Sequence, residues 1–154
     1  MNAVLREMVK QADGRYLNDE ELQPFEEYTS SFVLRFNTYN LLQEHSQQLI
    51  LQTLRRLIQT HRKTVQENGD KCQRDMAYTL GCVAKAILFN DTPGYIEGYV
   101  LWMQNITRAL HKQDSAVEAY RLLQTEIEAT LPADSARLVN KHLDSLVVAF
   151  ATDR

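Results

Sequence analysis

The amino-acid sequence predicts an all-α protein, and three observations support this prediction. Apolar residues recur at three- and four-residue spacing along almost the whole chain, as they do in amphipathic helices. No segment shows the alternation of apolar and polar residues that is typical of a β-strand. The 154 residues include only 5 Gly and 3 Pro, too few for the many tight turns of a β-sandwich or barrel. With 44% hydrophobic residues, the chain can form one sizeable core, so residues 1–154 are expected to form a single domain.

The first helices are predicted from a turn signal and a long aromatic stripe. A short amphipathic segment ends at Asp13-Gly14, and Asn18 or Asp19 is suited to cap the helix that follows. Aromatic side chains then recur on one helix face, where they predict either core packing or a subunit interface. This aromatic stripe consists of Phe25, Tyr28, Phe32, Phe36 and Tyr39.

The middle of the chain predicts two further helices. Ser46 is suited to cap the first of them, whose apolar stripe includes His61 and Val65 and which is expected to break at Asn68-Gly69. Asp70 is then expected to open a helix that continues to residue 89.

The last third predicts three helices separated by clear punctuation. Residues 90–94, with sequence NDTPG, form the strongest turn signal in the chain. The helices that follow are expected over residues 95–110, from Asp114 or Ser115 to 131, and from Asp134 or Ser135 onward. The total of seven or eight helices of uneven length favours globin-like packing over a regular four-helix bundle.

Charge and cysteine content exclude several classes of function. Lys and Arg number 17 against 20 Asp and Glu, so the net charge of −3 is unlike that of a nucleic-acid-binding protein. Two cysteines without metal-ligand spacing predict neither a disulfide framework nor a metal site, and they favour a reducing compartment. No signal peptide or membrane span is evident, which predicts a soluble, cytoplasmic protein. No nucleophile–base set or phosphate loop is present, so we do not expect an enzyme.

The segment 70–76, with sequence DKCQRDM, is the densest cluster of chemically versatile side chains. On a helix, Cys72, Asp75 and Thr79 share one face with Met76. Basic neighbours and a nearby helix N-terminus would favour the Cys72 thiolate, the form that attacks a ligand. The alternative is a surface helix start that holds an inert cysteine and an i,i+4 pair between Lys71 and Asp75.

Several segments together resemble the phycobiliproteins. Residues 70–80, DKCQRDMAYTL, are similar to the family's helix that carries the bilin-attachment cysteine in a K-C-x-R-D pattern. Residues 5–22 resemble the helical hairpin that the family adds in front of a globin fold, and residues 91–93, DTP, resemble its next turn. The resemblance covers essentially the whole chain. It implies a hairpin region over residues 1–30 and a globin-like core over residues 31–154.

The resemblance also implies roles for individual residues. Cys72 would form a thioether to a bilin such as phycocyanobilin, and Asp75 would accept hydrogen bonds from its pyrrole N–H groups. Lys71 and Arg74 would meet the propionates, and Tyr78 would pack on the bilin. The N-terminal hairpin and the aromatic stripe would form the contact of a homodimer or heterodimer.

Three departures from the family pattern favour a divergent member. Only residues 60–69 stand where the family has a long loop that cradles the bilin, so the floor of the pocket is expected to be shortened or missing. Gly81 replaces an arginine, and Trp102 stands where small residues are usual and can fill the cavity. The sequence therefore resembles the globins associated with bilin biosynthesis in photosynthetic cyanobacteria. This resemblance implies a protein that binds a tetrapyrrole, either bilin or haem, reversibly and supports bilin biosynthesis or handling.

Two alternatives stay open. The first is a light-harvesting phycobilisome subunit at the thylakoid surface that carries a thioether-linked bilin on Cys72. The second is a non-pigmented interaction protein of the same fold. Bilin-synthesis enzymes are the expected partners of the preferred interpretation, and phycobilisome subunits those of the antenna.

Four histidines and the second cysteine have simpler interpretations. His61 is a candidate axial ligand to haem iron, although a histidine bonded to a carbonyl is more common at such a position. His111 is expected at a helix end, His142 beside the core stripe of the last helix and His45 in a turn. Cys82 is expected to be a packed core thiol.

Overall fold

The computed structural model describes residues 3–152, and this part of the chain is helical almost throughout and contains no strand. The predicted all-α class is therefore confirmed. The helices are α1 (Ala3–Ala12), α2 (Asp19–Ser30), α3 (Phe32–Thr60), α4 (Arg62–Phe89), α5 (Thr92–Tyr95), the π-helical turn η1 (Ile96–Val100), α6 (Leu101–Ala109), α7 (Gln113–Thr130) and α8 (Ala133–Ala151).

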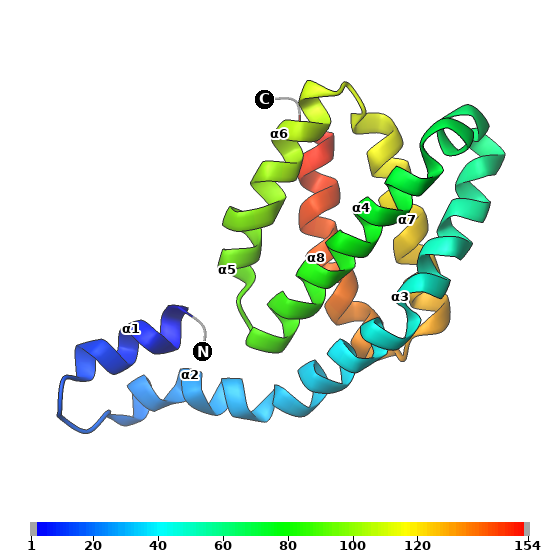
Figure 1. Cartoon of the computed structure of the whole chain (residues 1–154). Coiled ribbons are helices and arrows are strands. Elements are labelled where there is room, and N and C mark those ends of the chain that lie inside the picture. The colour runs from blue at the N-terminus through cyan, green and yellow to red at the C-terminus, as the bar shows by residue number, and fades with distance from the viewer. Residues whose placement is uncertain (1–2, 153–154) are drawn as a thin grey trace.

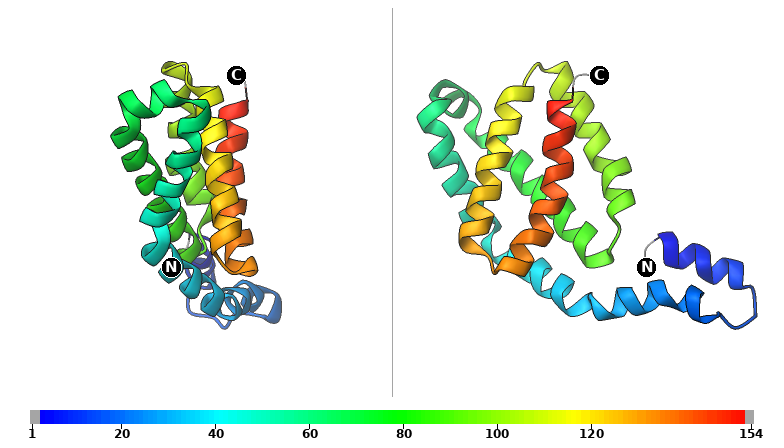
Figure 2. Two further views of the ribbon diagram at one scale, coloured as in Figure 1. Left: turned by 90° about the vertical axis from the view of Figure 1, so that its right-hand side faces the viewer. Right: turned by 180° about the vertical axis from the view of Figure 1, so that it is seen from behind.

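The helices from α3 onward form the core, and α1 and α2 extend away from it as an arm (Figure 1). Helix α3 packs mainly on α4, while α7 and α8 form an antiparallel pair that packs against α3 (Figure 2). The apolar stripe predicted for the last helix faces inward, because each of its members is buried. These residues are Val139, Leu143, Leu146, Val147 and Phe150.

The N-terminal arm is a helical hairpin, as predicted (Figure 1). Asp13 and Gly14 reverse the chain through left-handed backbone conformations, with φ of 38° and 81°. Asn18 then caps α2, since its side chain accepts a hydrogen bond from the Glu21 amide at 2.9 Å. The Glu21 carboxylate accepts in return from the Asn18 amide at 3.0 Å, which completes a capping box.

The predicted helix start at Ser46 is wrong, and so is the predicted turn at His45. Both residues lie inside α3, and the Ser46 hydroxyl donates to the Leu42 carbonyl one turn earlier instead of capping a new helix. The buried face continues across this point through Leu42 and Leu49, so tertiary packing keeps the helix intact. Helix α3 does not end until His61, where φ is −125° and ψ is 50°.

The predicted break at Asn68-Gly69 is confirmed and takes the form of a kink between two helical stretches of α4. Asn68 has φ of −130° and ψ of 15°, yet the helix continues on both sides of it within α4. Asp70 therefore lies at the start of the second helical stretch, close to where the sequence predicts a helix to open. Helix α4 ends where Asn90 adopts a left-handed conformation, at the start of the predicted NDTPG turn.

Protonation of His142 is expected to destabilise the fold. Its buried Nδ1 donates to the Leu138 carbonyl at 2.9 Å, and its ring packs edge-on against Tyr95. Burial lowers the pKa of His142, so the unfolded chain binds a proton more readily than the folded chain. This contribution to stability is fully present above pH 6.5, the ordinary histidine value, and is lost as the pH falls through the lower pKa of the folded state. Urea unfolding at pH 7.5 and pH 5 measures how much the free energy of unfolding falls between these two values. His142→Phe is expected to show a smaller fall. An equal fall in that variant would show that His142 is not responsible.

Candidate functional site

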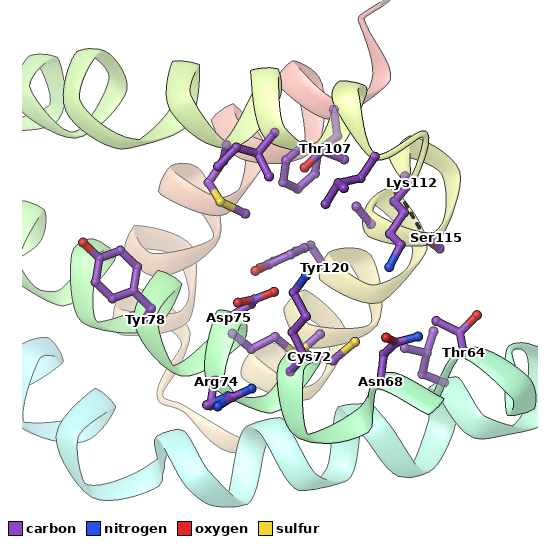
Figure 3. A pocket seen from close by; sticks show the side chains of 18 of the residues that line it. Thr64, Asn68, Cys72, Arg74, Asp75, Tyr78, Thr107, Lys112, Ser115 and Tyr120 are labelled. Carbon is purple, nitrogen blue, oxygen red and sulfur yellow. Dashed lines mark hydrogen bonds between the residues drawn. The ribbon is translucent and has the colours of Figure 1, made fainter. Parts of the chain in front are cut away.

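A cavity of about 690 Å³ lies between α4, α6 and α7 (Figure 3). Its volume falls in the range typical of small-molecule sites. Most of its wall is apolar, and much of that wall comes from α6, which turns half-buried side chains toward α4. The apolar wall includes Leu57, Met76, Met103, Ile106, Leu110, Ala116 and Phe150.

The structure brings all five predicted bilin-site residues to this cavity. Lys71, Cys72, Arg74, Asp75 and Tyr78 each line it from consecutive turns of α4. Figure 3 shows the Cys72 sulfur directed into the cavity, with Asp75 on the same side of the helix and Tyr78 farther along it. A thiol, a carboxylate and two cationic side chains therefore surround one apolar space.

The predicted Cys72 thiolate is wrong. Burial raises the pKa of the Cys72 thiol, and the Asp75 charge raises it further, while Lys112 and Lys71 lower it by smaller amounts. The kink at Asn68 leaves Cys72 near the start of the second helical stretch of α4, as the prediction assumed, but burial and the Asp75 charge outweigh the influences that favour the anion. Cys72 is a protonated thiol at neutral pH.

Lys112 is a third cation at the cavity, and the sequence interpretation missed it. It lies between α6 and α7, directly after His111, which adopts a left-handed φ of 54°. Figure 3 shows the Lys112 side chain extending into the cavity opposite Cys72. The only signal in the sequence was that Lys112 lies between two predicted helices. Loop residues at one end of a helical domain can gather around a binding site.

A cluster of buried hydroxyl groups lies at the inner end of the cavity. The Thr79 Oγ1 atom is 2.5 Å from the Tyr99 hydroxyl and 2.7 Å from the Tyr120 hydroxyl. Tyr99 comes from the π-helical turn η1, and Tyr120 comes from α7. The sequence gave no signal that Tyr99 and Tyr120 would meet Thr79.

His61 lines the cavity at the junction of α3 and α4, not on the apolar stripe of a single helix. Its Nδ1 atom lies 3.2 Å from a Glu118 carboxylate oxygen and 3.1 Å from the Thr60 hydroxyl. The sequence predicted a carbonyl as the usual hydrogen-bond partner of His61, and the structure places the Glu118 carboxylate beside it instead. The role of His61 as a haem ligand stays a prediction.

Two features were expected to alter the pocket: the short segment over residues 60–69 and the bulky Trp102. A helical segment with a kink at Asn68 stands here in place of a long irregular loop, as expected, and it supplies Thr64 and Asn68 to the cavity wall, so this side of the pocket is not missing. Trp102 stands at the cavity edge with 53% of its surface exposed. Its ring contacts Tyr99 at a centroid distance of 6.3 Å and leaves the cavity open.

The remaining candidate residues lie elsewhere. Cys82 is half-buried against the core, as expected, and lines a separate cavity of about 490 Å³. Burial raises the pKa of its thiol. His142 is buried beside the core stripe of α8, and His111 follows the end of α6. Within residues 3–152, no three His, Cys, Asp or Glu side chains gather in a way that could hold a metal ion.

Comparison with known proteins identifies the family. None of the helices within residues 3–152 is long and apolar enough to cross a membrane. A search of curated proteins found no match. Residues 7–150 match the family model described as phycobilisome protein, which covers nearly the whole chain and agrees with the resemblance of the hairpin and the K-C-x-R-D segment. The chain therefore belongs to the phycobilisome protein family and has its globin-like, all-α fold.

Proposed function

We propose that this protein binds an open-chain tetrapyrrole reversibly in the cavity beside Cys72 and supports bilin synthesis or delivery. The observation that carries this proposal is the convergence of Lys71, Cys72, Arg74 and Asp75 on one apolar cavity of about 690 Å³. Proteins of the phycobilisome family typically carry bilins, are structural light-harvesting proteins and not enzymes, and assemble with one another.

The residues present fit a bilin. A bilin is a long conjugated molecule with two propionates and several N–H groups, so it needs apolar walls, cations and an acceptor. Met103 and Ile106 supply apolar wall, Lys71 and Arg74 are cations suited to the propionates, and Asp75 is an acceptor for N–H groups. When bound, the bilin would supply visible absorption, and the protein would supply its orientation and shielding from water. Haem is the alternative ligand, with His61 as its candidate axial ligand.

The protonated Cys72 thiol favours reversible binding of a bilin over its permanent attachment. A thiol whose pKa is raised by burial attacks slowly at neutral pH, so bilin would bind first without a covalent bond. Tyr78 is largely exposed, which leaves one side of the site open for ligand exchange. The antenna alternative requires an attachment lyase to overcome the slow thiol. The non-pigmented alternative is disfavoured by an open cavity that Trp102 does not fill.

A second protein is expected to cover the aromatic stripe. The core interpretation of this stripe is wrong for Phe32 and Phe36, whose side chains are 42% and 45% exposed and stack on each other at 5.8 Å. Val33 is also exposed, so the first turns of α3 present an apolar surface. We propose that it forms a homodimer or heterodimer contact. Association with phycobilisome subunits would place the protein at the thylakoid surface, and association with bilin-synthesis enzymes would not require that location.

Titration with biliverdin and hemin tests the proposed function. We expect saturable absorption changes with biliverdin, and Ala116→Phe, which inserts a ring into the cavity, is expected to weaken binding at least tenfold. Ala109→Phe adds the same ring on the exposed side of α6 and serves as the control. No saturable binding of either ligand by the wild type would refute the proposal. A strong Cys72-dependent covalent signal after co-expression with a lyase would favour the antenna instead.

A further inference from the structure

The buried hydroxyl cluster has a defined set of contacts. Besides its two tyrosine neighbours, the Thr79 Oγ1 atom bonds to the backbone carbonyl of Asp75 at 2.9 Å. Tyr99 and Tyr120 line the cavity, whereas Thr79 is completely buried. Three hydroxyl groups with three hydrogens therefore make three contacts at the inner end of the pocket.

The directions of these bonds follow from the number of hydrogens. A carbonyl only accepts, so Thr79 must give its single hydrogen to Asp75. The Thr79 oxygen then offers only lone pairs, and both Tyr99 and Tyr120 must donate to it. No other assignment makes all three contacts hydrogen bonds. Both phenol oxygens are left with acceptor capacity and with no hydrogen to offer to a ligand.

The two phenols also stay neutral. Burial raises the pKa of Tyr99 and of Tyr120 well above the ordinary value for tyrosine. The inner end of the cavity is therefore an uncharged surface that accepts hydrogen bonds. The Asp75 carboxylate also lines the cavity and adds a further acceptor, although Asp75 itself is an exposed residue.

Cationic donors also line the cavity, on its solvent-facing part. Lys71 and Arg74 are exposed residues on α4, and Lys112 approaches from the α6–α7 connection, so all three present cationic donors to the cavity. A ligand matched to this arrangement has N–H groups along one part and carboxylates on another. A buried acceptor that has no hydrogen-bond donor costs free energy. A ligand without N–H groups leaves the phenol oxygens at the inner end of the cavity without a donor.

We propose that the cluster of Thr79, Tyr99 and Tyr120 selects metal-free, open-chain tetrapyrroles over haem. The phenol oxygens of Tyr99 and Tyr120 accept hydrogen bonds from pyrrole N–H groups, and Thr79 is the positioning residue that turns both O–H groups away from the ligand. Haem has the same two propionates and a similar apolar area, but its nitrogens are bound to iron and offer no N–H. This selectivity rests on the proposed tetrapyrrole-binding function and names the residues that choose the ligand.

Phenylalanine substitutions test the two acceptors directly. Wild type, Tyr99→Phe and Tyr120→Phe are titrated with biliverdin and with hemin, and affinity is followed by absorption. Each substitution keeps the ring and removes one acceptor, so biliverdin affinity is expected to fall roughly five- to tenfold and hemin affinity by less than about twofold. Thr53→Val is the matched control, because Thr53 is a buried helical threonine outside the cavity that bonds only to the Leu49 carbonyl.

Substitutions at Thr79 test the positioning role. In Thr79→Val the two phenol hydrogens lose their acceptor, can turn toward the cavity and oppose the ligand N–H groups. Biliverdin affinity is expected to fall by a similar factor with a shift of the bound absorption band, and Thr79→Ser is expected to restore both. Unchanged biliverdin affinity in both phenylalanine variants, or an equal loss for hemin, overturns the selectivity and leaves tetrapyrrole binding standing. A wild type that binds neither ligand removes both proposals. Because the phenylalanine variants keep the core packing, they decide the question even if Thr79→Val folds poorly.

Discussion

Raising the pH from 7 to 9 is expected to accelerate spontaneous attachment of phycocyanobilin to the purified protein by about a hundredfold. The pKa of the Cys72 thiol lies above its ordinary value of 9.0, so the thiol form predominates over this whole interval. The thiolate fraction then grows about tenfold for each pH unit, and only the thiolate attacks. The sulfur bonds to the ethylidene carbon of the bilin, and the displaced proton is returned to the neighbouring carbon. Zinc-induced fluorescence on a denaturing gel measures the covalent product over time.

Cys72→Ala is expected to abolish this covalent product and to leave reversible bilin binding within about threefold of the wild type. Cys82→Ala is the matched control, since Cys82 is also a half-buried thiol but lines the second cavity. A rate that does not change between pH 7 and 9 would show that the thiolate is already formed. That result would reverse the conclusion drawn from burial and would favour permanent attachment.

Replacing Arg35 with methionine is expected to lower the free energy of unfolding by about 2–4 kcal/mol. Arg35 is 3% exposed, and its guanidinium donates to the Tyr28 carbonyl at 2.6 Å and to the carbonyls of Ile87 and Leu88. It thereby joins the arm to the last turn of α4, whose carbonyls carry partial negative charge. The guanidinium also lies 4.3 Å from the centre of the Tyr28 ring. Removing it takes the guanidinium donors from all three carbonyls, although the Ile87 carbonyl keeps the Asn90 amide and the Tyr28 carbonyl keeps the Ser31 hydroxyl.

Urea unfolding measures this effect, and two variants define it. Arg35→Lys is expected to recover less than half of the loss, because one ammonium cannot replace a planar fork that reaches carbonyls on two helices. Arg137→Met removes an exposed arginine that pairs only with exposed Asp134, and its expected effect is below about 0.5 kcal/mol. An Arg35→Met protein as stable as the wild type would show that solvent replaces these bonds at no cost.

The sequence predicted the helices and their buried faces well, and it predicted the residues at which the helices begin and end less well. Periodicity alone indicated which side of the last helix is buried, and the Asn18 cap and the Asp13-Gly14 turn had local signals that the structure bears out. Ser46 carried a similar local signal and was misleading, because a serine can bond to the preceding turn when neighbouring apolar residues hold the helix together. Local patterns cannot report that tertiary contribution.

The candidate site was predictable on one helix only. The five predicted site residues lie within residues 71–78, where spacing along α4 places them near one another. Lys112, Tyr99 and Tyr120 come from other helices or their connections, and their approach depends on how α6 and α7 pack against α4. The protonation state of Cys72 also depended on packing, since burial outweighed the basic neighbours that the sequence showed. Contacts between distant segments, and the solvation they remove, are therefore what the sequence left undetermined.

The helical form of residues 62–69 has a consequence for how this pocket can change during evolution. Past its first turn, a helix uses its own amides internally, as the bond from the Val65 amide to the His61 carbonyl at 3.1 Å illustrates. The helical stretch before the kink at Asn68 therefore offers a ligand side chains such as Thr64 and little backbone. An irregular loop changes its backbone contacts whenever it is remodelled, whereas a helical rim can exchange one side chain and keep its shape. Ligand preference here is thus open to stepwise adjustment by single substitutions, without refolding of the wall that carries them.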